Sequence, residues 1–195
     1  MQICVYGASS NDIHPSFLQA GEELGMAMAR RGHGLVFGGG QTGMMGAVAR
    51  GMTKGGGKIV GVAPRFFDTE GVLYQQCTEF IFTETMRERK AIMEDRADVF
   101  VMTPGGIGTF EEFFEILTLR QLGRHNKPIY VLNTNHYYDA LQHMLEQAIE
   151  QEFMRPECRK LWEVFDDPEK LLDDAEFDPV AVLTPEELRS DLPRE

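Results

Sequence analysis

Short apolar runs alternate with longer amphipathic segments along most of this chain. The runs carry Val, Ile, Leu or Phe at consecutive positions, which is typical of strands buried on both faces. Each run is therefore predicted to form a strand. The six runs are "QICVYGAS" (2–9), "HGLVFGGG" (33–40), "KIVGVAP" (58–64), "TEFIFT" (78–83), "ADVFVMTPGG" (97–106) and "KPIYVLNT" (127–134).

Helices are predicted between these strands, because apolar residues recur there at three- and four-residue spacing. The segment 15–31 illustrates this, with Phe17, Leu18, Leu24 and Met28 on one face. Strands that alternate with helices form a parallel sheet covered on both sides. The pattern predicts an α/β fold, a Rossmann-like doubly wound parallel sheet. The other predicted helices cover 44–55, 85–96, 110–122 and 138–153.

The chain beyond residue 153 carries a weaker pattern. Leu161, Trp162, Leu171 and Leu172 predict helical turns that pack on the domain. We find no repeat, low-complexity segment or linker. A single domain over 1–180 is therefore expected, followed by a partly ordered C-terminal tail, 181–195.

Charge narrows the range of partners. Of the 195 residues, 43% are hydrophobic and 26% charged, as in ordinary soluble proteins. The formal net charge is −12, and residues 150–195, with 15 acidic and 6 basic side chains, supply most of it. Such a chain repels polyanions, so no nucleic acid polymer is expected as a partner. The nearly balanced remainder can still bind a small phosphate ligand.

The lengths of the apolar segments and the N-terminal sequence lead us to expect a cytoplasmic protein without membrane contact. None approaches the roughly 18 residues that span a bilayer, and the N-terminus lacks the features of a signal peptide. Cys4, Cys77 and Cys158 are widely spaced and form no redox or metal-type pair. We therefore expect free thiols. The histidines form no H-x-x-x-H cluster, so we also expect no metal site.

Small residues follow three of the predicted strands, at 7–10, 38–40 and 104–109. Ligands of open α/β sheets bind beyond the carboxyl ends of the strands, and a helix N-terminus after a glycine turn attracts phosphate. Tight turns alone explain one such cluster, but three of them favour a phosphate or nucleotide site.

Two common nucleotide motifs fit poorly. Gly38, Gly40 and Gly43 match G-x-G-x-x-G, yet the first strand lacks the pattern and no acidic residue follows at the expected spacing of about 20 residues. NAD binding is therefore disfavoured. The P-loop pattern G-x-x-x-x-G-K-[ST] does not occur.

Basic residues open the helix predicted over 85–96, in the segment "MRERK" (86–90). Cations in a first helical turn oppose the helix dipole. Either they are exposed to solvent, or they bind a phosphate or carboxylate, for which Arg is well suited.

The segment "TPGGIGTFEEFFE" (103–115) allows two readings. Thr109 and Glu112 have the T-x-x-E spacing of a capping box, which predicts Thr109 as N-cap and Glu112 as the third helical residue. Glu112 also lies off the apolar stripe of Phe110, Phe113 and Leu117, beside the glycine turn. The residues alone leave a cap and a catalytic carboxylate equally open.

These two segments together resemble the signature of the LOG ("Lonely Guy") family. The family pattern is an R-K dipeptide followed by P-G-G-x-G-T-x-x-E, here at 89–90 and 104–112. The likeness covers most of residues 1–150, through "VYGASS", "GGGQTGMMGAVA", "VGVAP" and "RQLGRHNKPIYVLNTNHYYDAL". One departure is Arg87, where the family has His, and it affects the expected base pocket.

The resemblance implies a nucleotide-binding catalytic domain that hydrolyses the N-glycosidic bond of cytokinin nucleoside 5′-monophosphates. Its products would be an adenine-type base and ribose 5-phosphate. It also implies a homodimer and no cofactor. By the same resemblance, Arg89 and Glu112 would form the catalytic pair. The other implied substrate- and phosphate-binding residues are Gly105, Gly106, Gly108, Thr109, Ser9, Gly39, Gly43, Met86 and Lys90.

Three alternatives accompany this expectation. A general AMP or purine nucleotide nucleosidase needs the same residues. A nucleotide or molybdenum-cofactor carrier of the same fold does not need the Arg89–Glu112 pair. Lysine decarboxylation, an older label of the family, needs a Schiff-base lysine, and no lysine is singled out in the sequence.

Overall fold

The fold is a seven-stranded sheet with the strand order β4-β3-β2-β1-β5-β6-β7, in a computed structural model that describes residues 1–177 and 183–189. All neighbouring strands are parallel. The strands are β1 (Gln2–Tyr6), β2 (Gly34–Phe37), β3 (Ile59–Pro64), β4 (Glu79–Thr83), β5 (Val99–Met102), β6 (Ile129–Leu132) and β7 (Glu163–Phe165). The chain builds one half of the sheet outward from β1, then crosses over at β5 and builds the other half. The predicted doubly wound fold is therefore confirmed.

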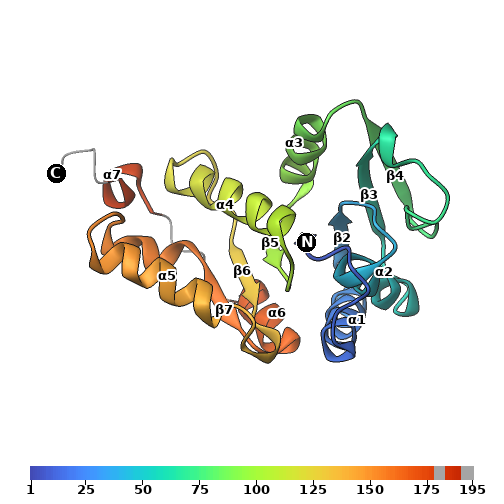
Figure 1. Cartoon of the computed structure of the whole chain (residues 1–195), viewed down its shortest axis with the longest axis horizontal. Helices are drawn as coiled ribbons and strands as arrows, with labels where there is room; N and C mark the ends of the chain where they lie inside the picture. The colour runs from blue at the N-terminus through green and yellow to red at the C-terminus, as the bar shows by residue number, and fades with distance from the viewer. Residues whose placement is uncertain (178–182, 190–195) are drawn as a thin grey trace.

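Helices cover both sides of this sheet, with α1, α2 and α6 on one side and α3, α4 and α5 on the other (Figure 1). The helices are α1 (Pro15–Arg30), α2 (Gly43–Lys54), α3 (Met86–Arg96), α4 (Ile107–Gln121), α5 (Asp139–Glu150), α6 (Pro168–Phe177) and α7 (Pro185–Leu188). Three short 3-10 turns are η1 (Arg65–Phe67), η2 (Thr134–His136) and η3 (Pro156–Leu161). None of the helices described is long and apolar enough to cross a membrane.

Two apolar cores lie against the two faces of the sheet. Successive strand residues point to opposite faces, so Ile3 and Val5 join the core under α1 and α2, whereas Cys4 and Tyr6 join the core under α3 and α4. Both cores are dense in fully buried side chains. Burial of one large apolar side chain contributes about 1.5–3 kcal/mol, which explains why the buried positions of these strands are mostly apolar.

Each predicted strand and helix has a counterpart in the structure, although several bounds differ by a few residues. Two differences matter here. The turns expected after residue 153 include a strand, β7, which pairs with β6 at the edge of the sheet. Helix α4 begins at Ile107, three residues before the predicted start. The predicted domain boundary at 180 lies outside the described residues, as does much of the predicted tail. Within 181–195, Leu188 of α7 is buried against the domain.

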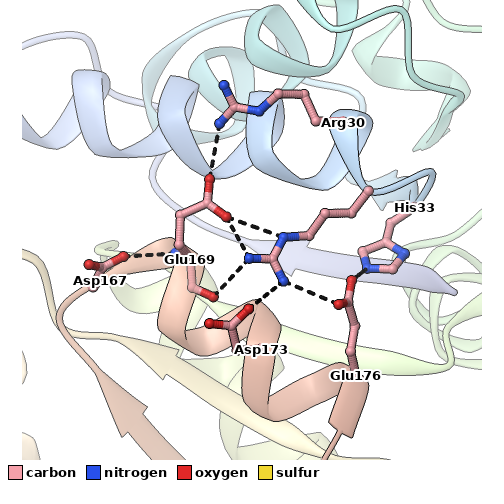
Figure 2. Close-up of polar contacts among 7 residues, drawn as sticks. Arg30, His33, Asp167, Glu169, Asp173 and Glu176 are labelled. Atoms are coloured by element: carbon pink, nitrogen blue, oxygen red, sulfur yellow. Dashed lines mark hydrogen bonds and ion pairs between the residues drawn. The ribbon is translucent and has the colours of Figure 1, made fainter.

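Helix α6 is fastened to the C-terminal end of α1 by a group of ion pairs (Figure 2). Arg31 is the centre of the group, and its side chain is 21% exposed. Arg30 and His33 extend the contacts on either side, to Glu169 and Glu176 respectively. Three acidic residues of the C-terminal segment are thus paired with basic residues at the end of α1. The three carboxylates that bind Arg31 belong to Glu169 (2.6 Å), Asp173 (2.8 Å) and Glu176 (3.2 Å).

We predict that Arg31→Ala lowers the free energy of unfolding by about 1–2 kcal/mol, because three partly exposed ion pairs are lost together. Arg30→Ala, which removes one exposed pair, is the matched control and has a smaller effect. Urea denaturation at low and high salt measures both. The difference between the two variants shrinks at high salt, where exposed charges are screened. Equal stabilities at low salt would contradict this role for Arg31.

Candidate active site

A cavity of about 510 Å³ opens at the carboxyl ends of β1, β2 and β5. This is the point where the strand order reverses, and ligands of doubly wound folds bind there. The volume lies within the range of about 300–1,000 Å³ that small-molecule sites occupy. Its strand-end lining comes from all three predicted clusters of small residues. Those lining residues are Gly7, Ala8, Ser9, Ser10, Gly38, Gly40, Gly106 and Gly108.

Arg89 of α3 and Glu112 of α4 form a buried ion pair in the wall of this cavity. Arg89 Nη1 lies 2.8 Å from Glu112 Oε1, and the side chains are 8% and 11% exposed. Arg89 Nε also donates to the carbonyl of Val62, at 3.2 Å. Both residues line the cavity. The two residues expected to form the catalytic pair are thus brought together. For Arg89, the anion that binds the basic segment is the carboxylate of Glu112.

Helix α4 starts differently from the capping box predicted for Thr109 and Glu112. Gly106 is the N-cap, because its carbonyl accepts the first helical hydrogen bond, from Phe110 N–H at 3.0 Å. Thr109 is therefore the third helical residue, and its side chain folds against Gly105, where a Cβ would lie 2.1 Å from Thr109 Oγ1. The capping role for Glu112 was wrong, and its side chain is left for the ion pair with Arg89.

A capping box does form at the start of α3, where none was predicted. Thr85 Oγ1 accepts from Glu88 N–H at 3.1 Å, and Glu88 Oε2 accepts from Thr85 N–H at 3.3 Å. Thr85–Glu88 has the same T-x-x-E spacing, so the signal was present in the sequence. This cap fixes the first turn of α3, which carries Arg89, and Glu88 offsets the basic residues there.

Close packing around Arg89 explains one of the glycines. A Cβ on Gly38 would lie 2.0 Å from Arg89 Nη2. A side chain at this position would clash with the guanidinium unless the guanidinium moved. The absence of a side chain at Gly38 therefore leaves space for the guanidinium of Arg89.

A segment that follows β3, between the strands predicted at 58–64 and 78–83, closes one side of the cavity. Phe67, Val72 and Leu73 line the cavity from this segment. It is held to the end of β2, since Gln41 N–H donates to Val72 O at 3.0 Å and Tyr74 N–H to Gly39 O at 2.8 Å. In the sequence, only its apolar residues, which lack helical or strand periodicity, hinted that this segment lines a site.

Other predicted site residues divide into two groups. Ser9, Met86, Gly106, Gly108 and Thr109 line the cavity. The remaining four are not among the lining residues that the structure describes. Three of them, Gly39, Gly43 and Gly105, shape the turns, Gly39 and Gly43 with positive φ. The fourth, Lys90, forms ion pairs with Glu111 and Glu115 of α4, the second at 2.6 Å, and so links α3 to α4.

Burial dominates the electrostatics of the carboxylate. It raises the pKa of Glu112 above the ordinary value of 4.5, while the neighbouring Arg89 guanidinium acts in the opposite direction. Beneath the pair, burial raises the pKa of Cys4 to about 12 and that of Tyr6 well above its usual value. Burial therefore makes the charged form of Glu112 less stable than in water, and a charge there interacts strongly with any bound ligand. No cluster of three or more metal-ligating side chains occurs among the described residues.

Comparison with known proteins places this geometry in a family. Residues 45–175 match the family described as "Possible lysine decarboxylase". A relative from Oryza sativa subsp. japonica, named as a probable cytokinin riboside 5′-monophosphate phosphoribohydrolase, is 35% identical over 175 residues, 90% of this chain and 70% of its own. A cytokinin riboside 5′-monophosphate phosphoribohydrolase of Arabidopsis thaliana is 36% identical over 160 residues, 82% of this chain and 74% of its own.

The chain belongs to the LOG family. The resemblance predicted from the two sequence segments is confirmed. In this LOG-family chain the R-K dipeptide lies on α3, and the glycine-rich segment joins β5 to α4. The fold is shared more widely. The molybdenum cofactor carrier protein of Chlamydomonas reinhardtii has a TM-score of 0.68 at 23% identity, covering 90% of this chain and 95% of its own.

Proposed function

We propose that this protein hydrolyses the N-glycosidic bond of nucleoside 5′-monophosphates, cytokinin ribotides included, to release an adenine-type base and ribose 5-phosphate. The buried Arg89–Glu112 pair in the cavity wall is the observation that carries the proposal. The names of its relatives in rice and Arabidopsis support the same reaction.

The phosphate would bind at the N-terminus of α4. The first N–H groups of a helix have no intrahelical acceptor, and together with the helix dipole they attract an anion. Gly106, Gly108 and Thr109 lie at this end of α4 and line the cavity. Ser9, at the end of β1, faces the same space from the neighbouring strand.

Glu112 and Arg89 would act at the ribose. When the bond from C1′ to the base nitrogen breaks, its electron pair leaves with the base and positive charge builds on the ribose ring. The Glu112 carboxylate stabilises that charge. Water then adds to C1′, and its proton compensates the charge on the departing base. Arg89 holds the carboxylate through Nη1 and donates from Nε to the carbonyl of Val62. The other N–H groups of its guanidinium would bind the substrate.

The base would lie at the apolar side of the cavity. Phe67, Val72, Leu73 and Met86 line that side and suit a planar base with an apolar substituent such as the side chain of a cytokinin. A carrier protein needs no buried ion pair beside the ribose, so the pair favours a hydrolase. Amino-acid decarboxylation has no support, because no lysine lines the cavity in the part of the chain described.

Replacement of both charges separates their chemical role from their structural one. Arg89→Met with Glu112→Leu is expected to leave the free energy of unfolding near that of the wild type, because the cost of burying both charges disappears as well. Arg89→Met alone leaves an unpaired buried carboxylate and costs about 3–5 kcal/mol.

The same double variant is expected to lose activity about 100-fold or more, since the electrostatic stabilisation of the transition state is gone. Incubation with AMP and with isopentenyl-AMP, followed by chromatography of the free base, measures this. The proposal fails if the wild type releases no base, or if the folded double variant releases it at the wild-type rate.

The pH dependence of turnover tests the ionised form of Glu112. Its carboxylate works only when charged, so kcat is full above the pKa of Glu112 and falls as the pH drops through it. Because burial raises that pKa, the acid limb is expected above pH 4.5. The substrate phosphate titrates near pH 6 and affects binding, so kcat at saturating substrate is the quantity to follow. A kcat that stays constant down to pH 4.5 would contradict this role.

We further propose that the protein works as a homodimer in the cytoplasm. Phe66, Phe67 and Phe82 are exposed around the edge strand β4, and a second copy would cover them. The three cysteines are free thiols, in keeping with a reducing compartment. Sedimentation velocity is expected to give twice the monomer mass of 22.0 kDa, and Phe66→Ser with Phe82→Ser to give the monomer. A wild type that sediments as a monomer would refute the dimer.

A further inference from the structure

The segment that follows β6 supports the glycine turn before α4 from outside the cavity. Tyr137 OH donates to the carbonyl of Gly105 at 2.8 Å, and Tyr138 OH donates to the carbonyl of Thr103 at the same distance. Between them, the carbonyl of Pro104 accepts Ala8 N–H at 3.1 Å. Three consecutive carbonyls of the turn are therefore each held by a donor from a neighbouring segment.

Fixing the carbonyl of Gly105 also fixes the next N–H group. In a trans peptide the C=O and N–H bonds lie in one plane and point in opposite directions. Since Tyr137 holds the carbonyl of Gly105, the N–H of Gly106 points away from Tyr137. Gly106 is the N-cap of α4 and lines the cavity. The Tyr137 hydroxyl therefore controls the orientation of an N–H group at the site proposed for phosphate.

The backbone that presents Tyr137 is held in an unusual conformation. Asn135 and His136 have positive φ values of 54° and 58°, which non-glycine residues seldom adopt. Asn133 stabilises the turn, since its Oδ1 accepts from Tyr138 N–H at 2.7 Å. Asn135 Nδ2 donates to Ser16 Oγ of α1, also at 2.7 Å. Strain of this kind persists only where the surroundings enforce it, and here it delivers two tyrosine hydroxyls to one turn.

The Tyr137 hydroxyl is not required for packing in the core. The residue is 44% exposed, and its ring packs edge-on against Phe17 at 5.8 Å and Tyr138 at 4.8 Å. Phe at this position keeps these ring contacts and loses only the hydrogen bond to Gly105. The contribution of the hydroxyl can thus be removed by itself.

We propose that Tyr137 is a positioning residue for phosphate recognition, acting through the carbonyl of Gly105 on the N–H of Gly106. The proposal rests on the proposed function, which places the 5′-phosphate at the N-terminus of α4. It separates recognition of the phosphate from recognition of the base, because Tyr137 acts on the turn and not on the apolar side of the cavity.

The test compares Tyr137→Phe with the wild type and with Tyr130→Phe. Tyr130 is the matched control, since its hydroxyl also makes one hydrogen bond, to Asp174 Oδ2 at 2.8 Å, on the side of α6. Ribose 5-phosphate and adenine are the probes, and calorimetry measures their binding. Neither is hydrolysed further, so binding is measured whether or not the proposed reaction occurs.

Tyr137→Phe is expected to weaken binding of ribose 5-phosphate about five- to tenfold, as for one lost hydrogen bond, with adenine changed less than about twofold. Tyr130→Phe is expected to change neither. In kinetics on AMP, KM rises with kcat nearly constant, the sign of lost ground-state binding. Equal weakening of both probes, or of neither, overturns the proposal. If ribose 5-phosphate binds as expected but no base is released from AMP, the proposed reaction fails and the role of Tyr137 stands.

Discussion

Two opposite charges, on Arg89 and Glu112, lie buried side by side at the carboxyl end of the sheet, and neither charge can stay buried there without the other. Moving an ion out of water costs several kcal/mol unless an opposite charge and hydrogen bonds compensate it. Here the compensation comes from the contact of 2.8 Å between the two side chains and from the carbonyl of Val62. The pair lasts only while α3 and α4 keep their relative position, which Lys90 reinforces through its carboxylate partners on α4.

The fold was predictable because the central strands of its sheet are buried on both faces. Five of the seven strands, β1, β2, β3, β5 and β6, are mainly apolar runs, which is typical of strands buried on both faces. The edge strand β4 has apolar residues between Glu79 and Thr83. The missed strand, β7, has three residues, and its Glu163 and Val164 are exposed at the sheet edge. Edge strands of that length bury too little to carry a periodic signal. The strand order is likewise set by packing between distant segments, which periodicity does not record.

The site was predictable in its chemistry but not in its local geometry. Arg89 and Glu112 stand out through the two family segments, whereas a T-x-x-E spacing alone does not fix where a helix starts: α4 begins before Thr109. Thr85 and Glu88 form the cap of α3, and Gly106 starts α4 because its carbonyl is free to accept Phe110 N–H. The apolar side of the cavity formed by Phe67, Val72 and Leu73 could not be predicted. These residues lie in an irregular loop, which is held by hydrogen bonds to the segment after β2 that no local sequence pattern indicates.

A strongly acidic protein is compatible with an anionic ligand because charge acts locally. The charged residues that line the cavity in the described part of the chain are Arg89, Glu111 and Glu112. Each of the two carboxylates is paired with a cation, Glu112 with Arg89 and Glu111 with Lys90. Three acidic residues of α6 form ion pairs with Arg31 at the C-terminal end of α1. With these charges balanced in pairs, the partial positive charge at the N-terminus of α4 is left to act on a phosphate, and the net charge of −12 does not decide what this cavity binds.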